Sequence, residues 1–83
     1  MTKLISIVDD EEDILELVKY NLAREGYQVH LAATGEEGIS SVRSQLPDLV
    51  ILDLMLPGID GLEVCRQLRN DSRTSHLPII MLT

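Results

Sequence analysis

Acidic side chains directly follow two of the most apolar segments in the sequence. The run Leu4–Val8 ends in Asp9 and Asp10. The run Leu49–Leu52 ends in Asp53. Because short aliphatic runs of this kind are typical of strands buried on both faces, each acid is expected just beyond the carboxyl end of a strand. Ligands of open parallel sheets bind at that end, where aspartates can hold a metal ion or attack a phosphoryl group.

A hydroxyl residue ends a third apolar segment, because Thr83 follows residues 78–82. If the three strands are neighbours, their carboxyl ends bring three carboxylates and this hydroxyl into one pocket. Carboxylates so close repel one another, so either a pKa rises or a cation neutralises them. Mg²⁺ is the simplest occupant, since it prefers oxygen ligands. Asp53 would then be the natural nucleophile, with Asp9 and Asp10 holding metal and Thr83 donating a hydrogen bond to the phosphoryl product.

Helical patterns separate the apolar runs and complete an alternating order. Capping boxes are indicated at Thr34 with Glu37 and at Asp60 with Glu63. The expected elements are strands over residues 4–8, 27–32, 49–52 and 78–82 and helices over residues 12–25, 34–46 and 60–70. The expected buried helix faces are Ile14, Leu15, Val18 and Leu22, then Ile39, Val42 and Leu46, then Leu62, Cys65 and Leu68. This order predicts a parallel sheet with helices on both faces and right-handed crossovers.

The composition excludes several classes of function. The 83 residues carry 14 Asp and Glu against 7 Lys and Arg, and this net charge of -7 argues against a nucleic-acid or anionic-membrane surface. Cys65 is the one cysteine, so an internal disulfide is excluded, and with His30 and His76 it does not form a zinc motif. The first residues lack a signal-peptide core or membrane span, and a cytoplasmic setting is expected.

Three segments together resemble the receiver domain of response regulators in two-component signalling. They are residues 8–11 (Val-Asp-Asp-Glu), residues 50–61 (Val-Ile-Leu-Asp-Leu-Met-Leu-Pro-Gly-Ile-Asp-Gly) and residues 78–83 (Pro-Ile-Ile-Met-Leu-Thr). The resemblance implies an α/β fold of the flavodoxin-like kind, a doubly wound parallel sheet with strand order 2-1-3-4-5. Residues 1–83 would be the N-terminal part of a single receiver domain, without its last helix, strand and helix.

By this resemblance Asp53 is the phosphoacceptor, and Asp10 and Asp53 bind Mg²⁺ (or Mn²⁺) through their side chains. Asp9 completes the acidic pocket, often contacting the ion through a water molecule, and Met55 contributes its backbone carbonyl as a metal ligand. Thr83 matches the residue that hydrogen-bonds the phosphoryl group and helps switch the domain. The matching turn after the acceptor contains Pro57, Gly58 and Gly61.

The resemblance also implies partners for a longer protein. A sensor histidine kinase would donate the phosphoryl group, and the receiver would catalyse at most its own phosphorylation and dephosphorylation. The segments at residues 54–61 and 21–27 look most like receivers of transcription regulators with a winged-helix output domain. DNA would be bound only by that absent domain, and no membrane is involved.

The chain departs from the family pattern where the sequence stops. The family continues with a fourth helix, a fifth strand ending in a lysine that contacts the phosphoryl group, and a fifth helix. Lys3 and Lys19 stand at the wrong places to substitute for that lysine.

Two alternatives remain open. One is a metal-dependent phosphatase or a flavin carrier, although Met55 stands where aspartyl phosphatases favour a second acid, and the acids after the first strand would repel a flavin phosphate. The other is an inactive or engineered receiver fragment that forms a homodimer or a swapped oligomer. In that fragment Ile79, Ile80 and Leu82 would lie on an exposed edge strand.

Overall fold

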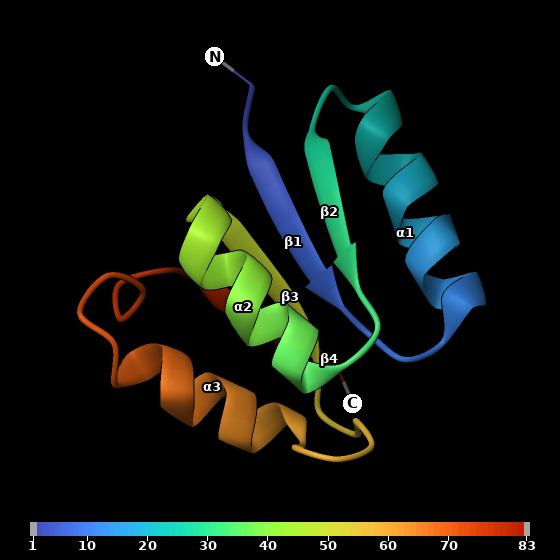
Figure 1. Cartoon of the computed structure of the whole chain (residues 1–83). Helices are drawn as coiled ribbons and strands as arrows, with labels where there is room; N and C mark the ends of the chain where they lie inside the picture. The colour runs from blue at the N-terminus through green and yellow to red at the C-terminus, as the bar shows by residue number, and fades with distance from the viewer. Residues whose placement is uncertain (1, 83) are drawn as a thin grey trace.

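A parallel four-stranded sheet lies between helices in the computed structural model, which describes residues 2–82 (Figure 1). The strand order is β2-β1-β3-β4, with α1 on one face and α2 and α3 on the other. The predicted doubly wound, flavodoxin-like arrangement is therefore confirmed for these strands. In chain order the elements are β1 (Leu4–Val8), α1 (Glu12–Arg24), β2 (Gln28–Ala32), α2 (Gly35–Gln45), β3 (Leu49–Asp53), α3 (Gly61–Arg69) and β4 (Ile79–Leu82).

The central strand β1 is almost entirely buried, and its side chains alternate between two hydrophobic clusters. Ile5 and Ile7 pack with Leu15 on the face covered by α1. Val8 belongs to the larger cluster beneath α2 and α3. Since strand side chains alternate between faces, a strand covered on both faces needs small or apolar side chains throughout, and the one polar side chain of β1 is the small Ser6, which is buried.

The helix starts follow the predicted capping chemistry. The Thr34 hydroxyl accepts a hydrogen bond from the Glu37 amide at 3.1 Å, and Asp60 Oδ1 accepts one from the Glu63 amide at 2.9 Å. In a capping box the Glu side chain accepts a hydrogen bond from the amide of the capping residue. Here Glu37 Oε2 accepts from the Ala33 amide instead of the Thr34 amide. These contacts satisfy amide groups that the helices leave without intrahelical partners. Among the described residues, none of the helices is long and apolar enough to cross a membrane.

Two leucines expected on buried helix faces are exposed instead. Leu46 follows the end of α2 and adopts a left-handed conformation with φ 46°, so it leaves the helical stripe. Leu62 is 64% exposed because the buried face of α3 is formed by Gly61, Val64 and Leu68. That spacing of three and four residues is the regular one for a helix face, and Leu62 lies outside it. The element boundaries otherwise differ from the predicted ones by at most one residue at either end.

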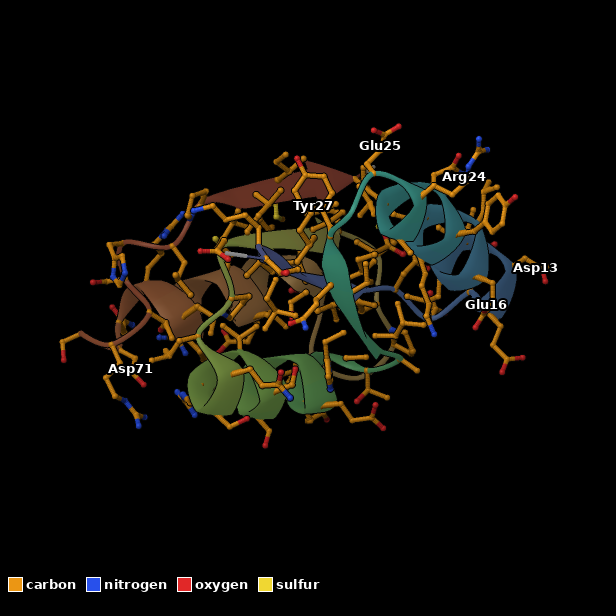
Figure 2. All side chains as sticks on the ribbon, turned by 90° about the horizontal axis from the view of Figure 1, so that it is seen from above. Asp13, Glu16, Arg24, Glu25, Tyr27 and Asp71 are labelled. Atoms are coloured by element: carbon orange, nitrogen blue, oxygen red, sulfur yellow. The ribbon has the colours of Figure 1, made fainter. Side chains whose placement is uncertain are left out.

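The segment between α3 and β4 is held by polar contacts. The Arg69 guanidinium donates to the carbonyls of Ser75 and Leu77, at 2.8 and 2.7 Å. Asp71 accepts hydrogen bonds from the Arg73 side chain and amide, and its Oδ2 lies 3.2 Å from Arg43 Nε of α2. Figure 2 shows Asp71 on the opposite side of the molecule from α1. Hydrogen bonds from the Arg73 side chain, then from its amide, lower the pKa of Asp71 to about 2.

Asp71→Asn should lower the melting temperature at pH 7, because it removes the charge that Arg73 and Arg43 share. Since the folded-state pKa of Asp71 lies below the ordinary value of 3.8, its contribution is present above that value and is lost as the pH falls toward 2. The difference in melting temperature between wild type and variant should therefore shrink over that interval. Circular dichroism melts at several pH values measure it. Glu16→Gln, beyond the first turn of α1, is the control, and an equally large loss there would contradict the assignment.

Candidate functional site

Three aspartates meet at the carboxyl ends of the two central strands. Asp9 and Asp10 follow β1, and Asp53 is the last residue of β3. One carboxylate oxygen from each lies within 4.8 Å of the others. The register explains the meeting. Val8 pairs with Leu52, so the residues that follow them, Asp9 and Asp53, lie side by side. The predicted convergence of the three carboxylates is what the structure contains.

The aspartates line an open pocket of about 540 Å³, whose other lining residues are Glu11, Ile14, Met55 and Leu82. Asp9 is buried, Asp53 is half-buried and Asp10 is exposed. The three carboxylates therefore differ in exposure: that of Asp9, at the end of β1, is the most buried, and that of the adjacent Asp10 is the most exposed. Neither Lys3 nor Lys19 lines this pocket, so no lysine of the described residues neutralises it.

Two of the carboxylates are fixed by amides two residues further along the chain. Asp9 Oδ1 accepts a hydrogen bond from the Glu11 amide at 2.9 Å, and Asp53 Oδ1 accepts one from the Met55 amide at 2.9 Å. Aspartate commonly forms such local turns. Within residues 2–82 the structure records no donor to either Oδ2, so each carboxylate keeps one oxygen for a ligand.

The electrostatics of the pocket favour a cation. Burial raises the pKa of Asp9 most, and the negative charges of Asp53 and Asp10 raise it further, while the hydrogen bond from the Glu11 amide opposes them. A bound cation removes the mutual repulsion of the three carboxylates. Oxygen ligands about 2.0–2.6 Å from a Mg²⁺ or Ca²⁺ ion lie up to about 4–5 Å from one another across it. The spacing and the all-oxygen chemistry of these residues fit such an ion.

The loop after Asp53 is shaped by close approach of backbone to backbone. A Cβ on Gly61 would clash with the Asp53 carbonyl oxygen and would lie 2.8 Å from the Leu54 Cα. The Gly61 amide also donates to the Leu54 carbonyl at 3.1 Å. Gly58, with φ 73°, takes the left-handed conformation that glycine allows. The start of α3 is thereby held against the end of β3, next to the carboxylates.

Three lining residues, Glu11, Ile14 and Leu82, were not assigned to the pocket from the sequence. Leu82 was expected in a buried strand, or on an exposed edge strand in the fragment alternative, and it is 37% exposed and lines the pocket. The signal lies in the register, because Leu82 is the β4 residue paired with Asp53. Thr83, predicted to complete the site, lies outside the described residues. His30 and His76, which were assigned no role, do not line the pocket.

Comparison with known proteins identifies the family. Residues 5–83 match the family model described as the response regulator receiver domain. The chain belongs to the response regulator receiver family. Its solved relatives agree in structure, since the N-terminal domain of a response regulator receiver protein from Methanoculleus marisnigri JR1 superposes with a TM-score of 0.96 at 35% identity. That match covers 100% of this receiver and 68% of the other chain.

The curated relatives are longer transcriptional regulators. This receiver is 51% identical over 83 residues to the alkaline phosphatase synthesis transcriptional regulatory protein PhoP of Bacillus subtilis (strain 168). It is 48% identical over 83 residues to the phosphate regulon transcriptional regulatory protein PhoB of Rhizobium meliloti (strain 1021). Both alignments cover 100% of this chain but only 34% and 37% of the relatives. The chain therefore spans about a third of their length.

Gly61→Ala should destabilise this receiver by about 1–3 kcal/mol, the usual cost of forcing extra volume into a packed site. The added Cβ meets backbone atoms of residues 53 and 54, which cannot move as a flexible side chain does. Urea unfolding gives the free energy, and amide NMR shifts of Leu54 and Met55 should report a displaced loop. Ser72→Ala, at an exposed position beyond the far end of α3, should leave those shifts nearly unchanged. Wild-type stability and shifts in Gly61→Ala would refute the close contact.

Proposed function

We propose that this receiver is a phosphoacceptor signalling module in which Asp53 receives a phosphoryl group from a sensor histidine kinase, with Mg²⁺ required. The observation that carries the proposal is the meeting of Asp9, Asp10 and Asp53 in one open pocket. Membership of the response regulator receiver family supports it. The receiver catalyses at most its own phosphorylation and dephosphorylation.

Asp53 is assigned as the acceptor because it ends β3, is half-buried and lines the open pocket with Asp9 and Asp10. Its Oδ1 is held by the Met55 amide, so Oδ2 is the oxygen that attacks phosphorus. A bond forms between Oδ2 and phosphorus as the bond between phosphorus and the donor histidine nitrogen breaks. The nitrogen keeps the electron pair and takes a proton from solvent. The product is an acyl phosphate on Asp53.

The metal ligands are the Asp10 and Asp53 carboxylates, the Asp9 carboxylate acting directly or through water, and the Met55 carbonyl. When bound, Mg²⁺ (or Mn²⁺) neutralises charge on the transferring phosphoryl oxygens. The Glu11 and Met55 amides orient the carboxylates of Asp9 and Asp53 before any ion or donor arrives. In this proposal Thr83 donates a hydrogen bond to the phosphoryl group and takes part in the switch.

The output of the whole protein is transcriptional in this proposal. The curated relatives are named as transcriptional regulatory proteins, and this chain matches about a third of each. Residues 1–83 are then the N-terminal part of one receiver domain in a cytoplasmic regulator. DNA is bound by a winged-helix output domain outside these residues, which is consistent with the net charge of -7 here.

A small phosphodonor such as acetyl phosphate, with Mg²⁺, should add one phosphoryl group to the chain. Intact-protein mass spectrometry measures the gain, and hydroxylamine should reverse it because the product is an acyl phosphate. Asp53→Asn should abolish the gain. Asp48→Asn, which removes a carboxylate just before β3 at the opposite end of the sheet, should keep it. A gain that persists in Asp53→Asn, or no gain in wild type with Mg²⁺ bound, contradicts the proposal.

Loss of a pocket carboxylate should weaken Mg²⁺ binding by about tenfold or more. Removing a group that only orients a metal ligand costs about tenfold or more in affinity, and removing a ligand should cost at least as much. Isothermal titration calorimetry of Asp10→Asn tests this, with Asp48→Asn as the control of equal charge. Asp9→Asn should also weaken binding, yet raise the melting temperature without metal at pH 7. Its pKa is raised in the fold, so the ionised carboxylate costs stability at neutral pH. Equal Mg²⁺ affinities for Asp10→Asn and Asp48→Asn would reject the assigned ligands.

A further inference from the structure

A groove runs between α2 and α3, on the face of the sheet that these two helices cover (Figure 1). Its volume is about 540 Å³. Sites that hold small molecules commonly have about 300–1,000 Å³. The groove is lined by side chains of α2, of the loop before α3, of α3 and of the segment before β4. It shares no lining residue with the acidic pocket, so the two sites are separate.

One end of the groove is basic. Arg43, in the last turn of α2, and Arg73, in the segment before β4, both line it. They share one carboxylate, because Asp71 Oδ2 lies 3.2 Å from Arg43 Nε and 3.0 Å from Arg73 Nη2. Figure 2 shows Asp71 beside one end of α2. Two guanidinium groups against one carboxylate leave a positive charge at this end.

The position of this basic end keeps it away from the three aspartates of the acidic pocket. Helix α2 ends just before β3 begins, so Arg43 lies toward the amino ends of the strands. Asp9, Asp10 and Asp53 lie at the carboxyl ends of the strands. The repulsion that an anion meets at the acidic pocket is therefore weak at the arginines, because it falls with distance and is screened by salt.

The guanidinium of Arg43 is not committed to a partner by hydrogen bonds. Its Nε is buried and has no acceptor among residues 2–82, since the Asp71 oxygen at 3.2 Å is not aligned with its N–H. The structure records no hydrogen bond from its terminal nitrogens within the same residues. The side chain is 38% exposed, so these donors are available to a ligand in the groove. Ser40, one turn earlier on α2, adds a hydroxyl to the same wall.

Apolar side chains line the groove beside this basic end. Ile39 of α2 is buried, Ile59 of the loop before α3 is half-buried, and both belong to the groove wall. Glu36 stands at the other end, seven residues before Arg43 on α2, or about 10 Å along the helix axis. The groove therefore favours a ligand with one anionic group at the arginines and an apolar body beside the isoleucines.

We propose that this groove binds a small organic phosphate, with its phosphoryl group at Arg43 and Arg73 and its apolar body against Ile39 and Ile59. A phosphate monoester has three terminal oxygens and a charge of about -1.5 to -2. It can accept hydrogen bonds from both guanidinium groups while Asp71 stays in place. A carboxylate brings only the single charge and two oxygens that Asp71 already supplies. The site does not depend on the phosphoacceptor role of Asp53.

An NMR titration of the 83-residue chain with phenyl phosphate, without Mg²⁺, tests the site. Saturable amide shifts should appear at Ser40, Ser44 and Ile59, with a dissociation constant of about 1 mM for a ligand of about ten non-hydrogen atoms. Inorganic phosphate should bind more weakly because it has no apolar body. Benzyl alcohol, which has no charge, should not shift these amides. The absence of saturable shifts, or shifts confined to the acidic pocket, overturns the proposal.

Two substitutions distinguish binding by the arginines from a structural effect. Arg43→Gln should weaken phenyl phosphate binding about tenfold, the effect of losing a hydrogen bond to a charged group. Asp71→Asn should tighten it about threefold or more, the Coulomb effect of one charge about 6 Å away in water, although the same change lowers the melting temperature. Glu16→Gln, which removes an equal charge on α1, should leave the affinity unchanged. Wild-type affinity in Arg43→Gln, or no tightening in Asp71→Asn, overturns the proposal.

Discussion

The parallel pairing of β1 with β3 is the constraint on which the site depends. Val8 and Leu52 are in register and fully buried, so the residues that follow them, Asp9 and Asp53, emerge side by side. A slip of one residue would turn buried side chains of a strand toward the wrong face of the sheet. The hydrophobic core therefore sets the distance between two carboxylates that would otherwise move apart. Core packing supplies the free energy that offsets their repulsion.

Local contacts then convert that register into a fixed geometry. The amides of Glu11 and Met55 each hold one oxygen of a carboxylate, and Gly61 lets α3 begin against the Asp53 carbonyl. This arrangement destabilises the ionised form of Asp9. Its pKa is raised, first by burial and then by the negative charges of Asp53 and Asp10. A site organised before its ligand arrives reduces the ordering required on binding. Stability and cation affinity thus oppose each other at Asp9.

The sequence predicts the strand positions and the meeting of the acids well, because apolar runs and the acids that end them are local signals. Its errors arise where packing decides. Leu46 has helical spacing from Val42, but the helix has ended there and the backbone turns left-handed. Leu62 is apolar, yet the close approach of Gly61 to β3 sets which side of α3 faces the core. For Leu82, hydropathy predicts a strand residue, but only the register with Asp53 reveals that it lines the pocket.

Strand β4 is hydrogen-bonded to the loop beside the acidic pocket. The Leu82 carbonyl accepts a hydrogen bond from the Leu54 amide at 2.9 Å, immediately after Asp53. The end of β4 therefore anchors the first residue of the loop that carries Met55. The position of the loop beside Asp53 therefore depends on how firmly β4 is held against β3, where Val50 to Asp53 pair with Ile79 to Leu82.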